Sequence, residues 1–196
     1  MNILIIDNGS IHTNKISKLF DGCDISVVSL HDKNIHDVST DTLAVLSGGR
    51  HTAVYGHEDV FRNEIEFIRH FGGPILGICL GFELIARVYG AQLYKMAQRR
   101  EEIHAITPTN SAEGLLPQRK LHVYEGHRWH VKNVGRPLIS LAESRDGVEI
   151  LRHESRPIYA TQFHPEVGTD NDGKVIWDAL VNLALSDTKK HKHDIL

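Results

Sequence analysis

The stretch that decides the fold is PILGICLGFELIA, residues 74–86. It begins as an apolar run typical of a buried parallel strand and continues with the composition of a helix. Between the two lies Cys79, with Gly77 and Gly81 each two residues away. Small residues on both sides suit a sharp strand-to-helix turn, because the backbone there comes close to itself. We therefore expect Cys79 at the first turn of a helix, where the dipole and free N–H groups favour a thiolate nucleophile.

Length and composition limit the classes of protein. The chain has 196 residues, 41% of them apolar and 24% charged, which predicts one globular domain (1–188) and a flexible basic tail (189–196). A net charge of -3 gives no reason to expect nucleic acid as a partner. The chain shows neither a signal peptide nor an apolar run of about 20 residues, so no membrane is expected. Two cysteines do not make a disulfide framework, which favours a cytoplasmic location.

The order of apolar runs predicts the fold class. Buried strands are expected at 2–6, 25–30, 43–46 and 74–78, and helices at 11–20, 58–71 and 79–88. Strands that alternate with helices predict a doubly wound, mostly parallel α/β sheet with flanking helices. Short β-rich runs in 103–163 then predict a small antiparallel section, before a last helix at 172–185. Ligands bind such sheets at the carboxyl ends of the strands, where both Ser47-Gly48-Gly49 and Cys79 are expected.

A candidate base for the cysteine stands in Gln162-Phe-His-Pro-Glu166. Proline holds His164 extended, and residues two apart in extended chain face the same side. The Glu166 carboxylate could then orient the His164 ring, whose other nitrogen would take the thiol proton. Taken alone, a His-Pro-Glu at a strand end could also have no role. Together with a glycine-flanked cysteine it predicts a Cys-His-Glu triad.

The segment 124–130 is polar and aromatic and lies in a connecting region. His127 and His130 are three residues apart and could pair around a metal on a helix. No acidic or cysteine partner is found at ligand spacing, so no metal is expected. No P-loop is present either, so we expect no cofactor.

At these residues the chain resembles a known family. Gly77-Ile-Cys-Leu-Gly81 with Gln162-Phe-His-Pro-Glu166 is similar to the class I (triad-type) glutamine amidotransferases. Ile5-Ile-Asp-Asn-Gly9, Leu46-Ser-Gly-Gly49 and Pro157-Ile-Tyr159 resemble the family's first strand and turn, its oxyanion loop and the strand before the histidine. The resemblance covers nearly the whole chain and implies the flavodoxin-like amidotransferase fold.

The resemblance also implies a reaction. Cys79 would attack the side-chain amide of glutamine, and His164, oriented by Glu166, would protonate the leaving ammonia. The backbone N–H groups of Gly49 and Leu80 would hold the oxyanion. Ammonia would pass to a separate synthetase or synthase subunit, because this chain has no second, nucleotide-binding domain. His127-Arg128-Trp129 would form a substrate loop or an interface with that partner, although a polar connector with a half-buried Trp129 is an equal alternative.

Two positions bear on the branch of the family. The turn and the oxyanion loop are closest to the glutaminase subunit of GMP synthetase, although Arg50 stands where that type commonly has proline. Glu83 stands where these amidotransferases usually have glutamine, and Cys-Leu-Gly-Phe-Glu also resembles γ-glutamyl hydrolases. Glu83 lies one helical turn past Cys79 and could contact the substrate's amino-acid end, or could simply complement the dipole. A stand-alone hydrolase of γ-glutamyl amides and a non-catalytic amidotransferase-like interaction protein therefore remain alternatives.

Overall fold

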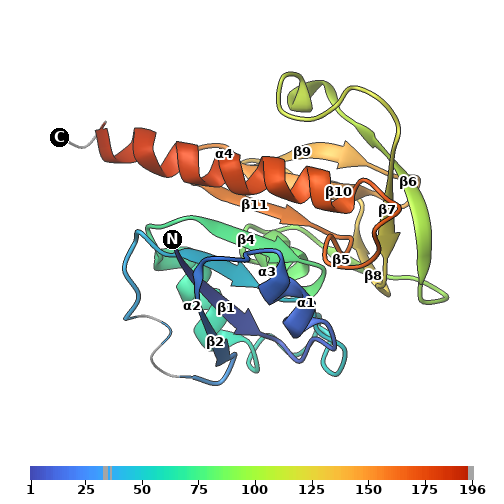
Figure 1. The fold of residues 1–196 in the computed structure, drawn as a ribbon. Coiled ribbons are helices and arrows are strands. Elements are labelled where there is room, and N and C mark those ends of the chain that lie inside the picture. The colour runs from blue at the N-terminus through green and yellow to red at the C-terminus, as the bar shows by residue number, and fades with distance from the viewer. Residues whose placement is uncertain (33–34, 36, 194–196) are drawn as a thin grey trace.

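The computed structural model describes residues 1–32, 35 and 37–193 and is built on one nine-stranded sheet, in the order β2-β1-β3-β4-β11-β10-β9-β6-β7 (Figure 1). The strands of this sheet are β1 (Asn2–Asp7), β2 (Asp24–Ser29), β3 (Leu43–Leu46), β4 (Ile75–Ile78), β6 (Glu102–Pro108), β7 (Leu121–Glu125), β9 (Leu138–Glu143), β10 (Val148–His153) and β11 (Ile158–Thr161). The helices are α1 (Thr13–Lys18), α2 (Arg62–His70), α3 (Leu80–Val88) and α4 (Gly173–His193), with a short 3-10 turn at Asn110–Ala112. This mixed α/β architecture confirms the predicted fold class.

The sheet has a parallel and an antiparallel half that meet at β11. Strands β2, β1, β3, β4 and β11 are parallel, whereas β10, β9, β6 and β7 continue the same sheet in antiparallel pairs. Every residue of β3, β4 and β11 is buried, as expected of parallel strands covered on both faces. The predicted antiparallel section is therefore an extension of the central sheet.

Alternating side chains divide the core into two layers. Leu4, Ile6 and Leu46 pack with α2 and α3 on one face, and Ile3 and Ile5 pack with α1 and α4 on the other. This follows from the two-residue period of a strand, which turns successive side chains to opposite faces. Figure 1 shows α4 lying along β11.

Several boundaries differ from the sequence-based prediction. The first helix spans Thr13–Lys18, and Ser10 accepts a hydrogen bond from the His12 N–H before the helix begins. The last helix runs to His193, so residues 189–193 of the predicted tail belong to α4, while 194–196 lie outside the described residues. A second, two-stranded sheet of β5 (Leu93–Lys95) and β8 (Trp129–Val131) was not predicted. Its strands have three residues each, too few to show a clear period in the sequence.

Candidate active site

The site begins at the turn between β4 and α3. Cys79 has φ 51° and ψ −99°, and it is the sole non-glycine residue of positive φ in the described part of the chain. Its N–H donates to the carbonyl of Thr161 (2.8 Å), and its own carbonyl accepts from the N–H of Glu83 (3.0 Å). Such a backbone costs roughly 1–3 kcal/mol and persists only where the surroundings enforce it. The strain places the Cys79 side chain at the carboxyl end of β4.

Two glycines make this turn sterically feasible, as their spacing predicted. A Cβ on Gly81 would lie 2.4 Å from the carbonyl oxygen of Leu46, and one on Gly77 would lie 2.8 Å from the backbone of Gly81. Any side chain at either position would force α3 away from β3 and β4. The glycines therefore let α3 begin directly behind the cysteine.

His164 and Glu166 come from the loop that follows β11. Because β3, β4 and β11 are adjacent and parallel, their carboxyl ends bring Gly48, Cys79 and His164 together. The Nδ1 of His164 lies 2.7 Å from Oε1 of Glu166, and both side chains are almost fully buried. A Cβ on Gly48 would lie 3.0 Å from Cε1 of His164 and 3.6 Å from Cβ of Cys79, so only glycine leaves room there.

The electrostatics of His164 fit an imidazolium paired with a thiolate. Burial lowers the pKa of His164, but the charge of Cys79, a hydrogen bond to it and the Glu166 carboxylate outweigh burial and raise this pKa to about 10. His164 therefore holds its proton at neutral pH. A proton held between a carboxylate and a thiolate can be delivered to a leaving group beside the sulfur.

The loop after β3 lies against Cys79 and is held from behind by a buried network. The N–H of Asn8 donates to Oγ of Ser47 (2.9 Å), and its Nδ2 donates to the Ser47 carbonyl (3.1 Å) and to Oε1 of Glu64 (3.1 Å). A Cβ on Gly49 would lie 2.6 Å from the Asn8 carbonyl oxygen, so the loop packs directly on the β1 turn. Glu64 is fully buried, and burial raises its pKa to about 8. Sequence reasoning missed this residue, because a carboxylate on a helix gives no signal of burial.

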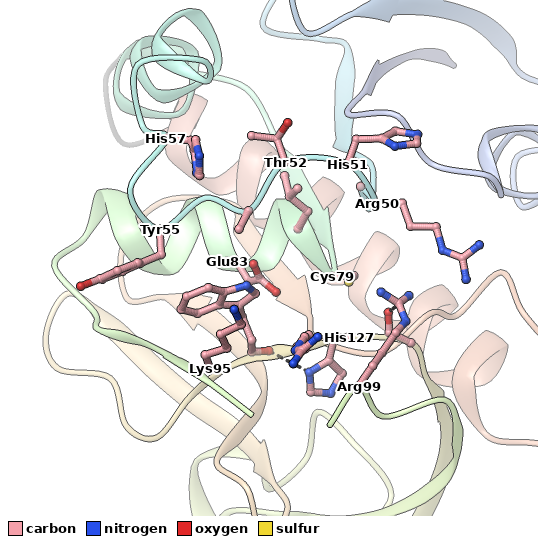
Figure 2. Close-up of a pocket in the computed structure, with 16 residues that line it drawn as sticks. Arg50, His51, Thr52, Tyr55, His57, Cys79, Glu83, Lys95, Arg99 and His127 are labelled. Atoms are coloured by element: carbon pink, nitrogen blue, oxygen red, sulfur yellow. Dashed lines mark hydrogen bonds between the residues drawn. The ribbon is translucent and has the colours of Figure 1, made fainter. Parts of the chain in front are cut away.

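A pocket of about 470 Å³ opens beside Cys79 (Figure 2). The predicted residues that line it are Gly49, Cys79, Leu80, Glu83, His127, Arg128 and Trp129. His164 faces a smaller neighbouring hollow, on the far side of Gly49 and Gly126. The structure thus brings one predicted set of residues around one cysteine.

The wall opposite Cys79 is cationic and aromatic. Tyr55 stacks on Trp129 with ring centroids 5.2 Å apart, and Nζ of Lys95 lies 5.8 Å from the Trp129 ring. Arg50, Arg99 and Arg128 also line the pocket, and Arg50 pairs with Glu101 at its rim (3.1 Å). Sequence analysis did not identify Tyr55, Lys95 or Arg99, because long-range pairing of β5 with β8 brings this wall together.

Glu83 lies in the same pocket, one turn into α3. It is 4% exposed, and its Oε1 accepts a hydrogen bond from Nε2 of Gln162 (3.4 Å). Burial raises the pKa of Glu83 to about 8, and the charges of Arg99 and His164 only partly oppose this. Near pH 7 the group is therefore mostly a neutral acid, similar in shape to the glutamine that the family usually has there.

His127 and His130 do not form the expected helical pair. The segment is a loop followed by β8, and the His130 ring packs edge-on against Tyr94. His127 instead faces Glu125 and Glu149, and these three are the group of potential metal ligands found among the described residues. The premise that no acidic residue stands near His127 was wrong, because Glu149 comes from a distant strand.

Comparison with known proteins agrees with this arrangement. The family model described as class-I glutamine amidotransferase matches residues 4–182. The chain belongs to this family. The glutamine-hydrolyzing subunit of GMP synthase from Pyrococcus abyssi is 32% identical over 93% of this chain and 96% of the relative.

Two further relatives carry a similar description. The corresponding subunit of Methanobrevibacter smithii is 38% identical over 120 residues, and this match spans 59% of the chain and 62% of that relative. A solved structure from Thermoplasma acidophilum, provisionally assigned as the same GMP synthase subunit, has 28% identity and a TM-score of 0.84, with 98% of both chains covered. These class I amidotransferase relatives are named as one of the subunits of GMP synthase. No helix in the described part of this chain could span a membrane.

Proposed function

We propose that this amidotransferase hydrolyses the side-chain amide of glutamine through a thioester on Cys79 and supplies the ammonia to a separate synthetase subunit. The observation that carries the proposal is the strained Cys79, hydrogen-bonded to a His164 that Glu166 orients. The names of the relatives support glutamine as the substrate and the synthetase part of a GMP synthase as the partner.

The residues account for each step of the reaction. The Cys79 thiolate attacks the amide carbon, and the N–H groups of Gly49 and Leu80 stabilise the oxyanion. His164 gives its proton to the amide nitrogen, so ammonia leaves and a γ-glutamyl thioester remains. Neutral His164 then takes a proton from water, which cleaves the thioester to glutamate and returns the thiolate. Overall, glutamine and water give glutamate and ammonia.

Leu80 and Gly49 are suitably placed for the oxyanion role. Leu80 is the first residue of α3, where an N–H group has no acceptor within its own helix. Gly49 follows the loop that Asn8 and Ser47 hold, and it lines the pocket beside Cys79. Both N–H groups belong to backbone that is fixed before the substrate arrives, which is what electrostatic stabilisation requires.

A stand-alone γ-glutamyl hydrolase is the second candidate, because two features of the pocket favour it. Glu83 replaces the usual glutamine, and about 470 Å³ is a volume typical of ligands larger than glutamine. Lys95, Arg99 and Arg128 would suit the carboxylates of a γ-glutamyl peptide. In this case no partner would be needed.

One experiment separates these functions. Glutamate release from glutamine and from a γ-glutamyl dipeptide is measured with the purified chain, alone and with the synthetase recovered on it from source extract. The proposal predicts weak release from glutamine alone and stimulation by the synthetase with ATP. Fast cleavage of the dipeptide without a partner would support the hydrolase instead. No release from either substrate, with or without the synthetase, would leave only a non-catalytic interaction protein.

A further inference from the structure

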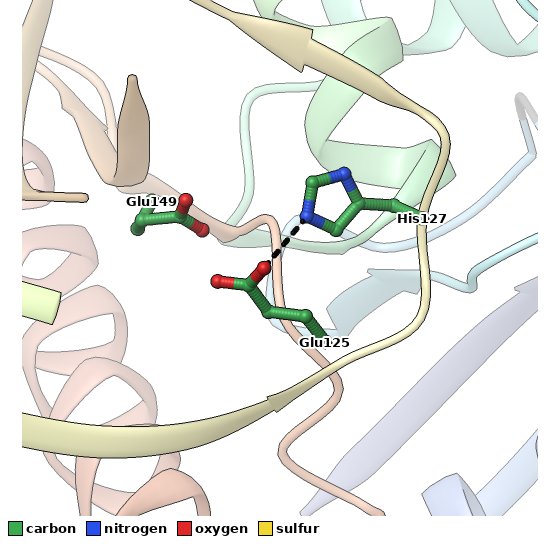
Figure 3. Close-up of side chains that lie close together, drawn as sticks. All are labelled: Glu125, His127 and Glu149. Carbon is green, nitrogen blue, oxygen red and sulfur yellow. Dashed lines mark hydrogen bonds and ion pairs between the residues drawn. The ribbon is translucent and has the colours of Figure 1, made fainter. Parts of the chain in front are cut away.

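A second cluster of chemically active side chains lies under the wall of the pocket, apart from the triad. It consists of Glu125 at the end of β7, His127 in the following loop and Glu149 on β10 (Figure 3). These side chains are at most 2% exposed, and one ligand atom from each lies within 4.8 Å of the others. The triad does not use them.

The hydrogen bonds of His127 fix which ring nitrogen carries the proton. Nδ1 lies 2.8 Å from the backbone carbonyl of Trp129, and a carbonyl can only accept, so Nδ1 is the donor. In the neutral ring the lone pair is then on Nε2, which lies 3.2 Å from Oε2 of Glu125. A histidine that donates one N–H to a carbonyl and presents the other nitrogen to carboxylates has the arrangement of a metal ligand.

Both carboxylates present unused oxygens. Oε1 of Glu149 accepts from Oγ of Ser144 (2.7 Å), which orients the group, whereas its Oε2 is buried without a partner among the described residues. Oε1 of Glu125 is also buried without such a partner. Figure 3 shows the two carboxyl groups facing each other beside the His127 ring. A buried acceptor with no donor costs about 1–3 kcal/mol, so these oxygens require a cation or a proton.

The charges near the cluster do not balance without an added cation. Arg100 is the nearby cation, with its Nε 3.0 Å from Oε2 of Glu125, and it also pairs with Asp146. One guanidinium against the carboxylates of Glu125, Glu149 and Asp146 leaves two negative charges when His127 is neutral. The further partner of Arg100, Glu102, is 57% exposed and solvated. One divalent cation would neutralise the remainder.

We propose that Glu125, His127 and Glu149 bind one divalent transition-metal ion of the Zn²⁺ type. An imidazole nitrogen with two carboxylates is a common zinc ligand set, and water can complete four ligands. Bonds of about 2.1 Å separate tetrahedral ligands by about 3.4 Å, so the observed spacing needs only small side-chain movements. The ion would tie the loop that carries Arg128 and Trp129 to β10, and it would thereby fix the pocket wall. This inference does not depend on the proposed reaction.

The test uses the full chain with Cys79→Ser, because the thiolate could itself bind zinc. The protein is treated with EDTA and titrated with ZnCl₂ by calorimetry, while Tm is followed over the same range. Glu149→Gln is the test variant, since it keeps the shape and the Ser144 contact. Glu143→Gln, at the exposed end of β9, is the matched control, and it reports zinc held by surface histidines.

The proposal predicts one tight equivalent of zinc in the parent and in Glu143→Gln, weakened about 100-fold or lost in Glu149→Gln. Zinc should raise Tm in the first two proteins only. Equal zinc binding in all three would overturn the proposal, because the metal would then lie elsewhere. So would the absence of tight binding in the parent, which would mean that two protons neutralise the cluster. If Glu149→Gln does not fold, anomalous diffraction from zinc-soaked crystals of the parent decides, and no peak between the three side chains overturns the site.

Discussion

The parallel and antiparallel halves of the sheet bury different chemistry. In the parallel half, β3, β4 and β11 are buried at every residue and deliver Gly49, Cys79 and His164 at their carboxyl ends. The antiparallel half buries charged groups instead, namely Arg100, Glu125 and Glu149. The reacting groups thus rest on a rigid apolar frame, whereas the wall of the pocket rests on a polar network. We therefore expect changes in the parallel half to remove the reaction, and changes around the pocket to alter substrate binding.

Replacing the nucleophile tests the parallel half most severely. Cys79→Ala should lower glutamate release by a factor of about 10⁴ or more, because no thioester can form. Tm should stay near that of the parent, since alanine keeps a Cβ in the same strained conformation. Stopped assays with coupled glutamate detection measure the rate. Activity within tenfold of the parent would remove Cys79 from the mechanism.

Removing the orienting carboxylate should cost slightly less. Glu166→Gln should lower kcat about 10³-fold, because the amide no longer fixes the His164 tautomer or stabilises its cation. Loss of the carboxylate should also lower the pKa of His164, which Glu166 helps to raise. NMR titration of the His164 ring reads this directly. An unchanged His164 titration together with low activity would indicate a structural role only, and the exposed Glu113→Gln serves as control.

Glu64 is the buried acid that supports the oxyanion loop of the parallel half. Its folded-state pKa of about 8 lies above its ordinary 4.5, so the stability it contributes is complete below pH 4.5 and is lost as the pH rises through 8. Glu64→Gln stays neutral and should gain about 2 kcal/mol over the parent between pH 5 and pH 9, with about 5 kcal/mol as the ceiling for such a shift. Urea unfolding at both pH values measures the difference. Glu66→Gln, on the exposed side of α2, should not show this gain.

Glu83 tests the pocket and should give the smallest effect. If its carboxylate contacts the substrate ammonium, KM for glutamine should fall about tenfold between pH 7 and pH 8.5, since the group ionises around pH 8. Glu83→Gln should lose this dependence, and comparison at each pH cancels the titration of glutamine itself. Parallel KM profiles in both proteins, with equal kcat/KM, would exclude the contact. Glu101→Gln, at the rim, is the matched control.

The parallel half could be predicted largely from its sequence, because its signals are local. Apolar runs marked β3 and β4, Gly77 and Gly81 marked the turn, and His164 with Glu166 followed from a two-residue spacing. The fold class and the family are confirmed. The roles of Cys79, His164 and Glu166 remain proposals that the geometry supports.

The polar network could not be predicted, because its members meet only in the folded chain. Glu149 reaches His127 through the pairing of strands far apart in sequence, and no local pattern marks either residue as buried. Glu64 lies on the face of α2 that was expected to be apolar, and Asn8 from the β1 turn makes its burial possible. Ile65, expected in the core, is only half-buried. Tertiary contacts override helix periodicity at such positions.

The most direct test of the account is to look for the thioester itself. The chain is mixed with glutamine, with and without its synthetase, quenched in acid within a turnover and digested for mass spectrometry of the peptide that contains Cys79. The account predicts a γ-glutamyl group on Cys79 that hydroxylamine removes and that does not form in Cys79→Ser. Steady glutamate release with no adduct on Cys79, and with full activity in Cys79→Ser, would contradict it.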